Sequence, residues 1–242
     1  RAIDHASPVA SAQVKGALLL AGLAARVPVV VREPHLSRDH TERMLRARGV
    51  PVAVEEAADG RATVTLAADA PAPRPLDQRV PGDFSAAVFW VVWSLLARRP
   101  LVVRDVGLNP TRTGALDVLR RMGAELAVTG VRDEGGEPVG DLAVRPGPLA
   151  ATEVASAEVP RCIDEIPALA AAAVRARGTF AVRGASELRV KESDRIRALV
   201  ENLRALGVAC RERPDGLEVE GTDRPLRGRV RAFGDHRIAM AF

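Results

Sequence analysis

The chain has 242 residues and a formal net charge of +4, with 35 basic residues interspersed among 31 acidic ones. Tyr is absent, there are five Phe and two Trp, and basic residues form no block, which argues against nucleic-acid binding because bases find little to stack on. The longest uncharged run, residues 80–97 broken by Asp83, is too short to span a bilayer. Two Cys without metal or disulfide spacing argue against a secreted domain, so we expect a cytoplasmic protein.

Three copies of one pattern of elements run along the chain. Each copy begins with an apolar run long enough for a helix, at residues 10–23, 83–97 and 161–174. A short strand follows, at residues 29–31, 101–104 and 179–183. An amphipathic helix then ends at Gly49, Gly123 or Gly207, each placed as a C-cap residue that needs a positive φ. Two alternating strands close each copy, so the repeat is roughly βαβαββ.

The two ends of the chain interrupt this pattern. Residues 234–237 match residues 82–85 and begin a fourth copy, but the chain stops at Phe242. No strand is expected before the first apolar helix. We therefore expect a fragment of a longer protein. In it, residues 1–78 form the last βαβαββ unit of a first domain, and residues 79–242 form two complete units and the start of a third in a second domain.

The first helix of each copy lacks a polar face, because residues 16–25, 84–97 and 166–174 carry no charge. A helix that is apolar all round must be buried on all sides. The sequence therefore predicts domains with helices inside and sheets as walls. The N-termini of the inner helices would converge at one end and, facing the other domain, would form an anion-binding cleft.

Polar residues occupy these helix starts in the first and third copies. Ser11 can act simply as a helix cap, and so can Asp164 or Glu165, although a cap exposed in a cleft can also meet a ligand. Lys15 stands where a surface cation opposes the helix dipole unless an anion is nearby.

The second helix of the third copy carries a stronger signal, because residues 188–195 concentrate charge before and within its first turn. Glu192 can lie between Lys191 and Arg195 on one helix face. The alternative is a solvated turn with surface ion pairs, which are common and individually weak. In the second copy, Asn109 as N-cap with Pro110 at N1 is explained by capping alone.

Five motifs together resemble the 5-enolpyruvylshikimate-3-phosphate synthase (3-phosphoshikimate 1-carboxyvinyltransferase) family. They are SAQVK at 11–15, NPTRTG at 109–114, IDEIP at 163–167, ELRVKESDRI at 187–196 and GDHRIAMA at 234–241. The resemblance runs in order along essentially the whole chain, and the last two motifs are the most specific. It implies a mixed α/β (α+β) fold of repeated βαβαββ units, an inside-out barrel with helices inside and sheets outside, which agrees with the repeat.

The resemblance also implies an activity. The enolpyruvyl group of phosphoenolpyruvate would move to the 5-hydroxyl of shikimate 3-phosphate with release of phosphate, in the shikimate pathway of aromatic amino acid biosynthesis. Neither a metal nor an organic cofactor is implied. The implied enzyme is a cytoplasmic monomer at full length and binds neither nucleic acid nor membrane, and the 242 residues alone are expected to be inactive.

Site residues follow from the same resemblance. Asp164 would act as the base, and Glu192 would handle the methylene proton. The residues implied for phosphoenolpyruvate are Gln13, Arg195 and Arg237. Those implied for shikimate 3-phosphate are Ser11, Ala12, Gln13, Ser37, Asp164 and Lys191.

Two rival interpretations remain. The sister enzyme, UDP-N-acetylglucosamine enolpyruvyl transferase, shares the fold and the donor, but its Cys-bearing loop has no equivalent here. Cys162 and Cys210 are expected in the core rather than as nucleophiles. A non-catalytic module that binds anionic metabolites is the second rival, and the presence together of both candidate acids and both arginines argues against it.

Overall fold

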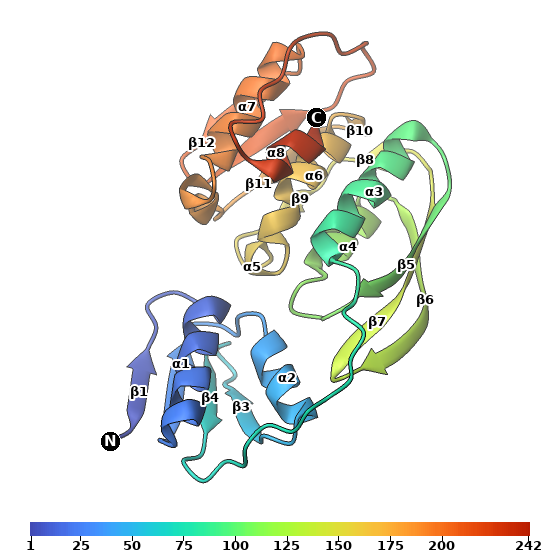
Figure 1. Ribbon diagram of the computed structural model, residues 1–242. Coiled ribbons are helices and arrows are strands. Elements are labelled where there is room, and N and C mark those ends of the chain that lie inside the picture. Colours follow the sequence, from blue (N-terminus) through green and yellow to red (C-terminus); the bar gives the residue numbers. More distant parts are fainter. The chain divides into compact units, whose positions relative to one another are not determined.

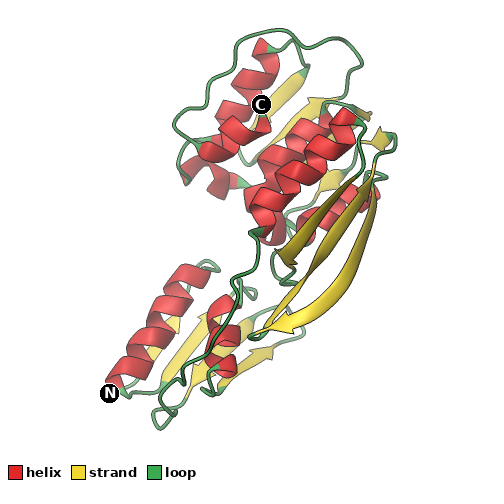
Figure 2. Cartoon of the chain, turned by 45° about the vertical axis from the view of Figure 1, so that its right-hand side comes forward, coloured by secondary structure: helices red, strands yellow, loops and turns green.

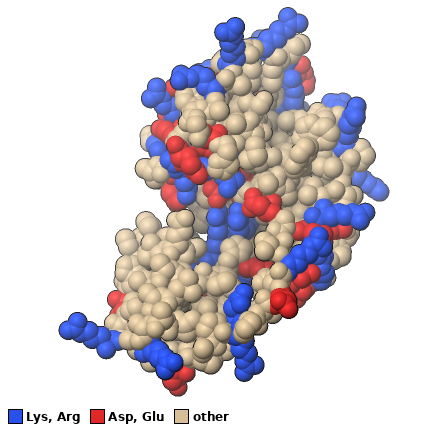
Figure 3. Space-filling model, viewed as in Figure 1, with Lys and Arg blue, Asp and Glu red and all other residues tan.

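The computed structural model describes all 242 residues and divides into two compact units (Figure 1). Unit 1 comprises Arg1–Pro81 and Arg132–Val139, and unit 2 comprises Gly82–Val131 and Gly140–Phe242. None of the helices combines the length and the apolar character needed to cross a membrane. On the face shown in Figure 3, acidic side chains lie among the basic ones rather than in a separate area.

Unit 1 is built on a four-stranded sheet with strand order β1-β2-β4-β3, in which β1 and β2 are parallel and the other neighbours are antiparallel. Its two helices lie on the same face of the sheet (Figure 2). Leu19, Leu45 and Val64 from these elements are buried in one core. The elements are β1 (Ile3–Ala6), α1 (Ala12–Ala25), β2 (Val29–Glu33), α2 (His40–Ala47), β3 (Val52–Glu56) and β4 (Ala62–Leu66).

Unit 2 has two sheets, with strand orders β5-β7-β6 and β12-β13-β11-β9, and a short β8–β10 pair. Helix α6 lies at its centre and contacts α3 and α8 (Figure 1). The strands are β5 (Leu101–Gly107), β6 (Glu125–Glu134), β7 (Glu137–Arg145), β8 (Leu149–Ala150), β9 (Glu153–Val154), β10 (Ala176–Arg177), β11 (Thr179–Val182), β12 (Cys210–Arg213) and β13 (Gly216–Glu220). The helices are α3 (Phe84–Ala97), α4 (Gly114–Arg121), α5 (Val159–Cys162), α6 (Ile166–Ala173), α7 (Arg195–Ala205) and α8 (His236–Ala241), with 3₁₀ turns η1 (Ile163–Glu165) and η2 (Ser186–Val190).

The repeated helix, strand and hairpin pattern is confirmed, and so are its glycine stops. Gly49, Gly123 and Gly207 follow α2, α4 and α7 with φ angles of 82°, 94° and 81°. A side chain at these positions would be strained, because L-residues with a Cβ rarely adopt this left-handed region. The three glycines therefore turn the chain from the amphipathic helix into the hairpin.

Two expectations about the first helices are wrong. A strand does precede α1, because β1 pairs in parallel with β2 from Ile3 opposite Val29 to Ala6 opposite Arg32. The expected third helix at 161–174 is broken into α5, η1 and α6. Pro167 lies at the start of α6, and its missing N–H cannot continue the hydrogen-bond ladder from the preceding turn.

The expectation that these helices are buried on all sides holds for α6 but is wrong for α1 and α3. Nearly every residue of α6 is buried. In contrast, Trp90 and Trp93 on α3 are 58% and 46% exposed, and Leu20 on α1 is 46% exposed. Helix α1 contacts β2 and β4, and α3 contacts α6 and β5, so each of them is covered on one side.

The second helices begin later than expected. Helix α4 starts at Gly114, and the Asn109 side chain instead accepts hydrogen bonds from the N–H (2.9 Å) and hydroxyl (2.6 Å) of Thr111. Asn109 thus forms an Asx turn, in which the side-chain oxygen accepts a hydrogen bond from the residue two positions later instead of capping a helix. Helix α7 starts at Arg195 with Asp194 as its N-cap, so Lys191 and Glu192 lie in the turn before the helix.

Candidate active site

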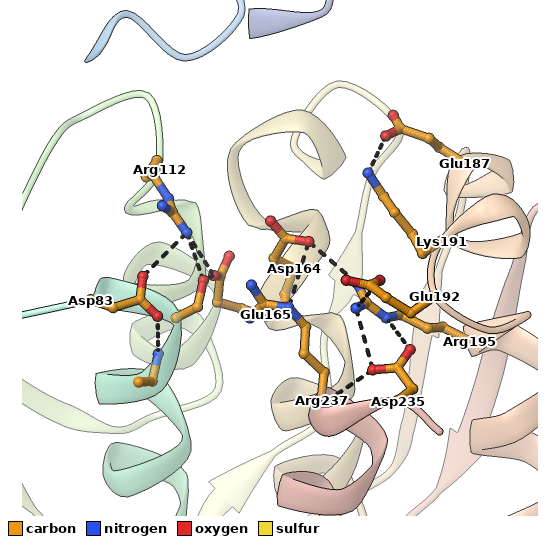
Figure 4. A network of polar contacts seen from close by, with 12 residues as sticks. Asp83, Arg112, Asp164, Glu165, Glu187, Lys191, Glu192, Arg195, Asp235 and Arg237 are labelled. Carbon is orange, nitrogen blue, oxygen red and sulfur yellow. Dashed lines mark hydrogen bonds and ion pairs between the residues drawn. The ribbon is translucent and has the colours of Figure 1, made fainter. Parts of the chain in front are cut away.

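Arg195 forms the centre of a buried cluster of charged side chains in unit 2 (Figure 4). Its Nε lies 2.8 Å from Oδ2 of Asp235, its Nη2 lies 2.6 Å from Oε2 of Glu192, and its Nη1 lies 3.3 Å from Oδ1 of Asp164. The Arg195 side chain is only 1% exposed. A guanidinium buried this deeply is tolerated because three carboxylates satisfy its N–H groups.

Two helix caps hold the arginines of this cluster in place. The Asp194 carboxylate accepts from the Arg197 N–H at 3.0 Å and caps α7, whose first residue is Arg195. The Asp235 carboxylate accepts from the Arg237 N–H at 2.9 Å and caps α8. Both arginines are therefore fixed at the starts of helices, where the backbone N–H groups add positive potential.

Asp235 belongs to both the cap and the cluster. Its Oδ2 also accepts from the Ser193 hydroxyl at 3.0 Å. Burial acts to raise the pKa of Asp235, but the hydrogen bonds from the Arg195 guanidinium and the Arg237 N–H outweigh burial and hold this pKa below its ordinary value. Asp235 is thus an anion that neutralises Arg195 from the protein side.

The two candidate catalytic acids lie on the solvent side of the same arginines. The Asp164 side chain, on η1, is 13% exposed, and that of Glu192 is 51% exposed. Arg237 donates to the Asp164 backbone carbonyl at 3.4 Å, and its Nε lies 3.8 Å from the Asp164 carboxylate. The structure therefore brings together Asp164, Glu192, Arg195 and Arg237.

Lys191 contacts none of these four side chains. Its ammonium pairs with Glu187 on η2, four residues earlier, and its side chain is 26% exposed (Figure 4). This pair is an ordinary surface contact, as in the alternative interpretation of residues 188–195.

In unit 1, Ser11 and Ser37 meet at the carboxylate of Glu33, which is 3% exposed. Oε1 of Glu33 accepts from the Ser11 N–H at 3.0 Å and from the Ser37 hydroxyl at 2.8 Å. The Ser11 hydroxyl caps α1 by accepting from the Val14 N–H at 3.4 Å. Ala12 and Gln13 form the first turn of that helix, and Gln13 is exposed.

Lys15 is buried beside these serines, and its ammonium lies 3.1 Å from Oε2 of Glu33 and 2.7 Å from Oε1 of Glu42. Its side chain is fully buried, so the anions that it requires come from the protein itself. Sequence reasoning missed Glu33 and Glu42, for which no local signal exists. It placed Asp235 at the last helix start but gave it no role in the site.

Neither cysteine has the character of a nucleophile. Burial, and secondarily the charges of Glu165 and Glu158, raises the pKa of the Cys162 thiol to about 12. Burial also raises the pKa of Cys210, whose thiol donates to the Val200 carbonyl at 3.6 Å. Both thiols therefore stay protonated near neutral pH. No group of three or more His, Cys, Asp and Glu side chains is arranged to hold a metal ion.

The fold, with repeated βαβαββ units and charged residues at helix starts, is that of the enolpyruvyl transferases. The enolpyruvyl transferase NikO from Streptomyces tendae shares this fold with a TM-score of 0.62 over 88% of the chain and 48% of its own, at 21% sequence identity. An EPSP synthase from Acinetobacter baumannii superimposes with a TM-score of 0.88 at 39% identity and covers all of this chain and 55% of its own.

The sequence comparisons identify the family within this fold. The family model of EPSP synthase (3-phosphoshikimate 1-carboxyvinyltransferase) matches residues 1–242, so the chain belongs to this family. The 3-phosphoshikimate 1-carboxyvinyltransferase of Geobacter sp. (strain M21) is 51% identical over 240 residues, which are 99% of this chain and 54% of the relative. That of Gloeobacter violaceus is 51% identical over 243 residues, 100% of this chain and 55% of the relative. The chain thus spans about half the length of the curated relatives it matches.

Proposed function

We propose that the protein transfers the enolpyruvyl group of phosphoenolpyruvate to the 5-hydroxyl of shikimate 3-phosphate and releases phosphate. The observation that carries this proposal is the cluster of Asp164, Glu192, Arg195 and Arg237 in a chain of the EPSP synthase family. Two helix-start arginines suit an anionic substrate, and two partly exposed acids suit proton transfer. Residues 1–78 and 79–242 would belong to two domains of this enzyme.

In the proposed mechanism, Asp164 takes the proton of the attacking hydroxyl and Glu192 delivers a proton to the methylene carbon, which gives a tetrahedral intermediate. The C–O bond to phosphate then breaks, and Glu192 takes a proton back from the methyl carbon, which restores the double bond. Arg237 is the cation best placed for phosphoenolpyruvate, because its contacts with Asp164 are long, at 3.4 and 3.8 Å. The guanidinium of Arg195 already pairs with the carboxylates of Asp164, Glu192 and Asp235. It would hold the substrate with its remaining N–H capacity and by exchanging its contact with the half-exposed Glu192 side chain.

The exposure of the three acids supports Glu192 as the proton carrier. Its side chain is 51% exposed, against 13% for Asp164 and 0% for Asp235. Glu192 is therefore the acid of this cluster that a substrate can reach most readily.

We assign shikimate 3-phosphate to Ser11, Ala12, Gln13 and Ser37 of unit 1 and to Asp164 and Lys191 of unit 2. The N-terminus of α1, with Ser11 as its cap, supports a phosphate site in unit 1 because its N–H groups attract anions. The Ser37 hydroxyl donates to Glu33 in this structure, so its contact with a phosphate would require that hydroxyl to turn. Gln13, which is exposed beside Ser11, would also reach phosphoenolpyruvate.

The test is a chimera in which this chain replaces the matched 240 residues of the Geobacter sp. relative. Phosphate release is measured with both substrates. Asp164→Ala and Glu192→Gln should each lower kcat by about 10²–10⁴ without unfolding the protein, as expected for general acid–base residues. Glu201→Gln, on the exposed face of α7, is the matched control and should leave kcat unchanged.

Two results would overturn the proposal. If the chimera folds but releases no phosphate, the proposed enolpyruvyl transfer is wrong. Phosphate release with UDP-N-acetylglucosamine in place of shikimate 3-phosphate would favour the sister reaction. A variant that keeps full kcat would remove only that residue from the mechanism.

A further inference from the structure

The NPTRTG segment, which the proposed reaction does not use, lies against the turn that carries Asp164. Arg112, in the turn before α4, donates from Nη2 to the Ser85 hydroxyl at 2.6 Å. The same Nη2 lies 3.9 Å from Oε1 of Glu165 and 3.7 Å from Oδ1 of Asp83 (Figure 4). The Ser85 hydroxyl donates in turn to Glu165. One guanidinium thus joins the start of α3 to η1.

The backbone of the NPTRTG segment is also close to the same region. A Cβ on Gly114 would lie 2.9 Å from Cβ of Arg161 and 3.1 Å from its carbonyl carbon and oxygen. The Arg161 Nε donates to the Pro110 carbonyl at 3.2 Å. Glycine is therefore required at 114, because any larger residue would push α4 away from the segment that leads into η1.

Glu165 and Asp164 are neighbours on η1, and their carboxylates point to different sets of partners (Figure 4). Glu165 is 1% exposed and faces Ser85 and Arg112. Asp164 faces Arg195 and Arg237. A rotation of η1 would therefore break contacts on both sides at once.

Ile163 anchors the turn in the core of unit 2, but the backbone hydrogen bonds of η1 fix the orientation of its two carboxylates only weakly. It is a single 3₁₀ turn of three residues without a side-chain cap at Cys162, and 3₁₀ hydrogen bonds are poorer than those of an α-helix. Glu165 is buried, so it must be paired to be tolerated there. Its contacts with Ser85 and Arg112 hold the turn in addition to the 3.4 Å hydrogen bond that Arg237 donates to the Asp164 carbonyl.

We propose that Arg112, Ser85 and Glu165 form a positioning clamp, which holds η1 in the orientation that presents Asp164 to the reacting hydroxyl. The inference rests on the proposed function, since it concerns Asp164 as the base. Arg112 acts through its planar guanidinium, which reaches Ser85 and two carboxylates together, whereas a lysine ammonium is a single point charge. None of the three clamp residues needs to touch a substrate.

The test compares Arg112→Gln in two backgrounds of the chimera, one with Asp164 and one with Asp164→Ala. With Asp164 present, kcat should fall at least about tenfold, because small misplacements of a catalytic group are costly, and KM for phosphoenolpyruvate should stay within about twofold. In the Asp164→Ala background the same change should alter kcat by less than about twofold. Only a residue that acts through Asp164 gives this non-additive result.

Three further variants separate positioning from general destabilisation. Ser85→Ala is the milder change and should reproduce a smaller loss of kcat with the same background dependence. Arg121→Gln is the matched control, because Arg121 pairs with Glu158 on the surface of the same unit, and it should leave kcat unchanged. Leu119→Ala removes a buried core side chain of α4 and serves as a variant of matched stability loss.

Three results would overturn the clamp. Arg112→Gln could lower kcat equally in both backgrounds, or it could leave kcat unchanged. It could also lower kcat no more than Leu119→Ala does when the two variants have the same melting temperature. An inactive but folded parent chimera is a different result, because it overturns the proposed function. A parent that is active, together with additive losses, overturns the clamp alone.

Discussion

Lys15 illustrates what single residues in the sequence reveal and what they hide. Its position at a helix start correctly indicates a nearby anion. The anions are Glu33 and Glu42, which lie 18 and 27 positions later on other elements, and no local pattern points to them. In the same way, Asp164 is recognisable in its motif, whereas its pairing with Arg195, 31 positions later, depends on tertiary packing. The pair between Glu192 and Arg195 is local, three residues apart, and the sequence indicates it.

Replacing Lys15 with Met should destabilise unit 1 strongly. The change leaves Glu33 and Glu42 buried without a cation, and breaking a buried ion pair from one side costs about 3–5 kcal/mol. Urea unfolding of the 242-residue chain measures this loss. The double variant Lys15→Met with Glu42→Gln removes one buried negative charge as well and should recover part of the stability.

Arg61→Gln provides the matched control for this prediction. Arg61 pairs with Asp59 on the surface of the same unit, where the two side chains are 73% and 52% exposed. Loss of such a pair costs at most about 1 kcal/mol. If Lys15→Met were no more destabilising than Arg61→Gln, the buried cluster would not stabilise the fold.

At the scale of elements, the sequence predicts what depends on local chemistry. The glycine stops after α2, α4 and α7 follow from the positive φ that they require, and the hairpins follow from strict alternation. The break before α6 is hidden, because Asp164 and Glu165 are equally suited to the first turn of one continuous helix, and only Pro167 interrupts the backbone ladder. Strand β1 is hidden because four residues show too little alternation. The local backbone of the site could therefore not be predicted either, because Asp164 lies on η1, within this break.

The cap of α8 gives a pH-dependent prediction. The folded pKa of Asp235 lies below its ordinary value of 3.8, so its carboxylate stabilises the fold fully above about pH 4 and loses this contribution as the pH falls through the lowered pKa. Asp235→Asn should therefore be less stable by about 1–3 kcal/mol near neutral pH. The difference from the parent should shrink between about pH 4 and pH 2.

Urea unfolding at a series of pH values measures this difference. Asp223→Asn, at an exposed position in the loop before α8, is the matched control and should follow the parent at every pH. A gap that widens on acidification would reverse the sign of the argument and remove Asp235 as a stabilising anion.

At the scale of the whole chain, each of the two units has a hydrophobic core of its own. One core contains Leu19, Leu45 and Val64, the other contains Leu119 and Ile166, and the two have no residue in common. The family membership and the mixed α/β fold are predictable because five motifs and a threefold repeat point to them together. The expected cytoplasmic monomer and the inactivity of the isolated 242 residues stay predictions, because they depend on more than one chain's internal contacts.

Separate cores predict unfolding in two steps. Each unit buries its own apolar side chains, so each can lose its packing while the other keeps its own. Leu45→Ala should lower the stability of unit 1 by about 2–5 kcal/mol and shift only one transition, and Leu119→Ala should shift the other by a similar amount. Hydrogen exchange followed by mass spectrometry assigns each transition to its unit, because protection should be lost in α1 and β2 for the first variant and in α4 and α6 for the second. A single transition that both variants shift equally would mean that the two cores unfold as one cooperative structure.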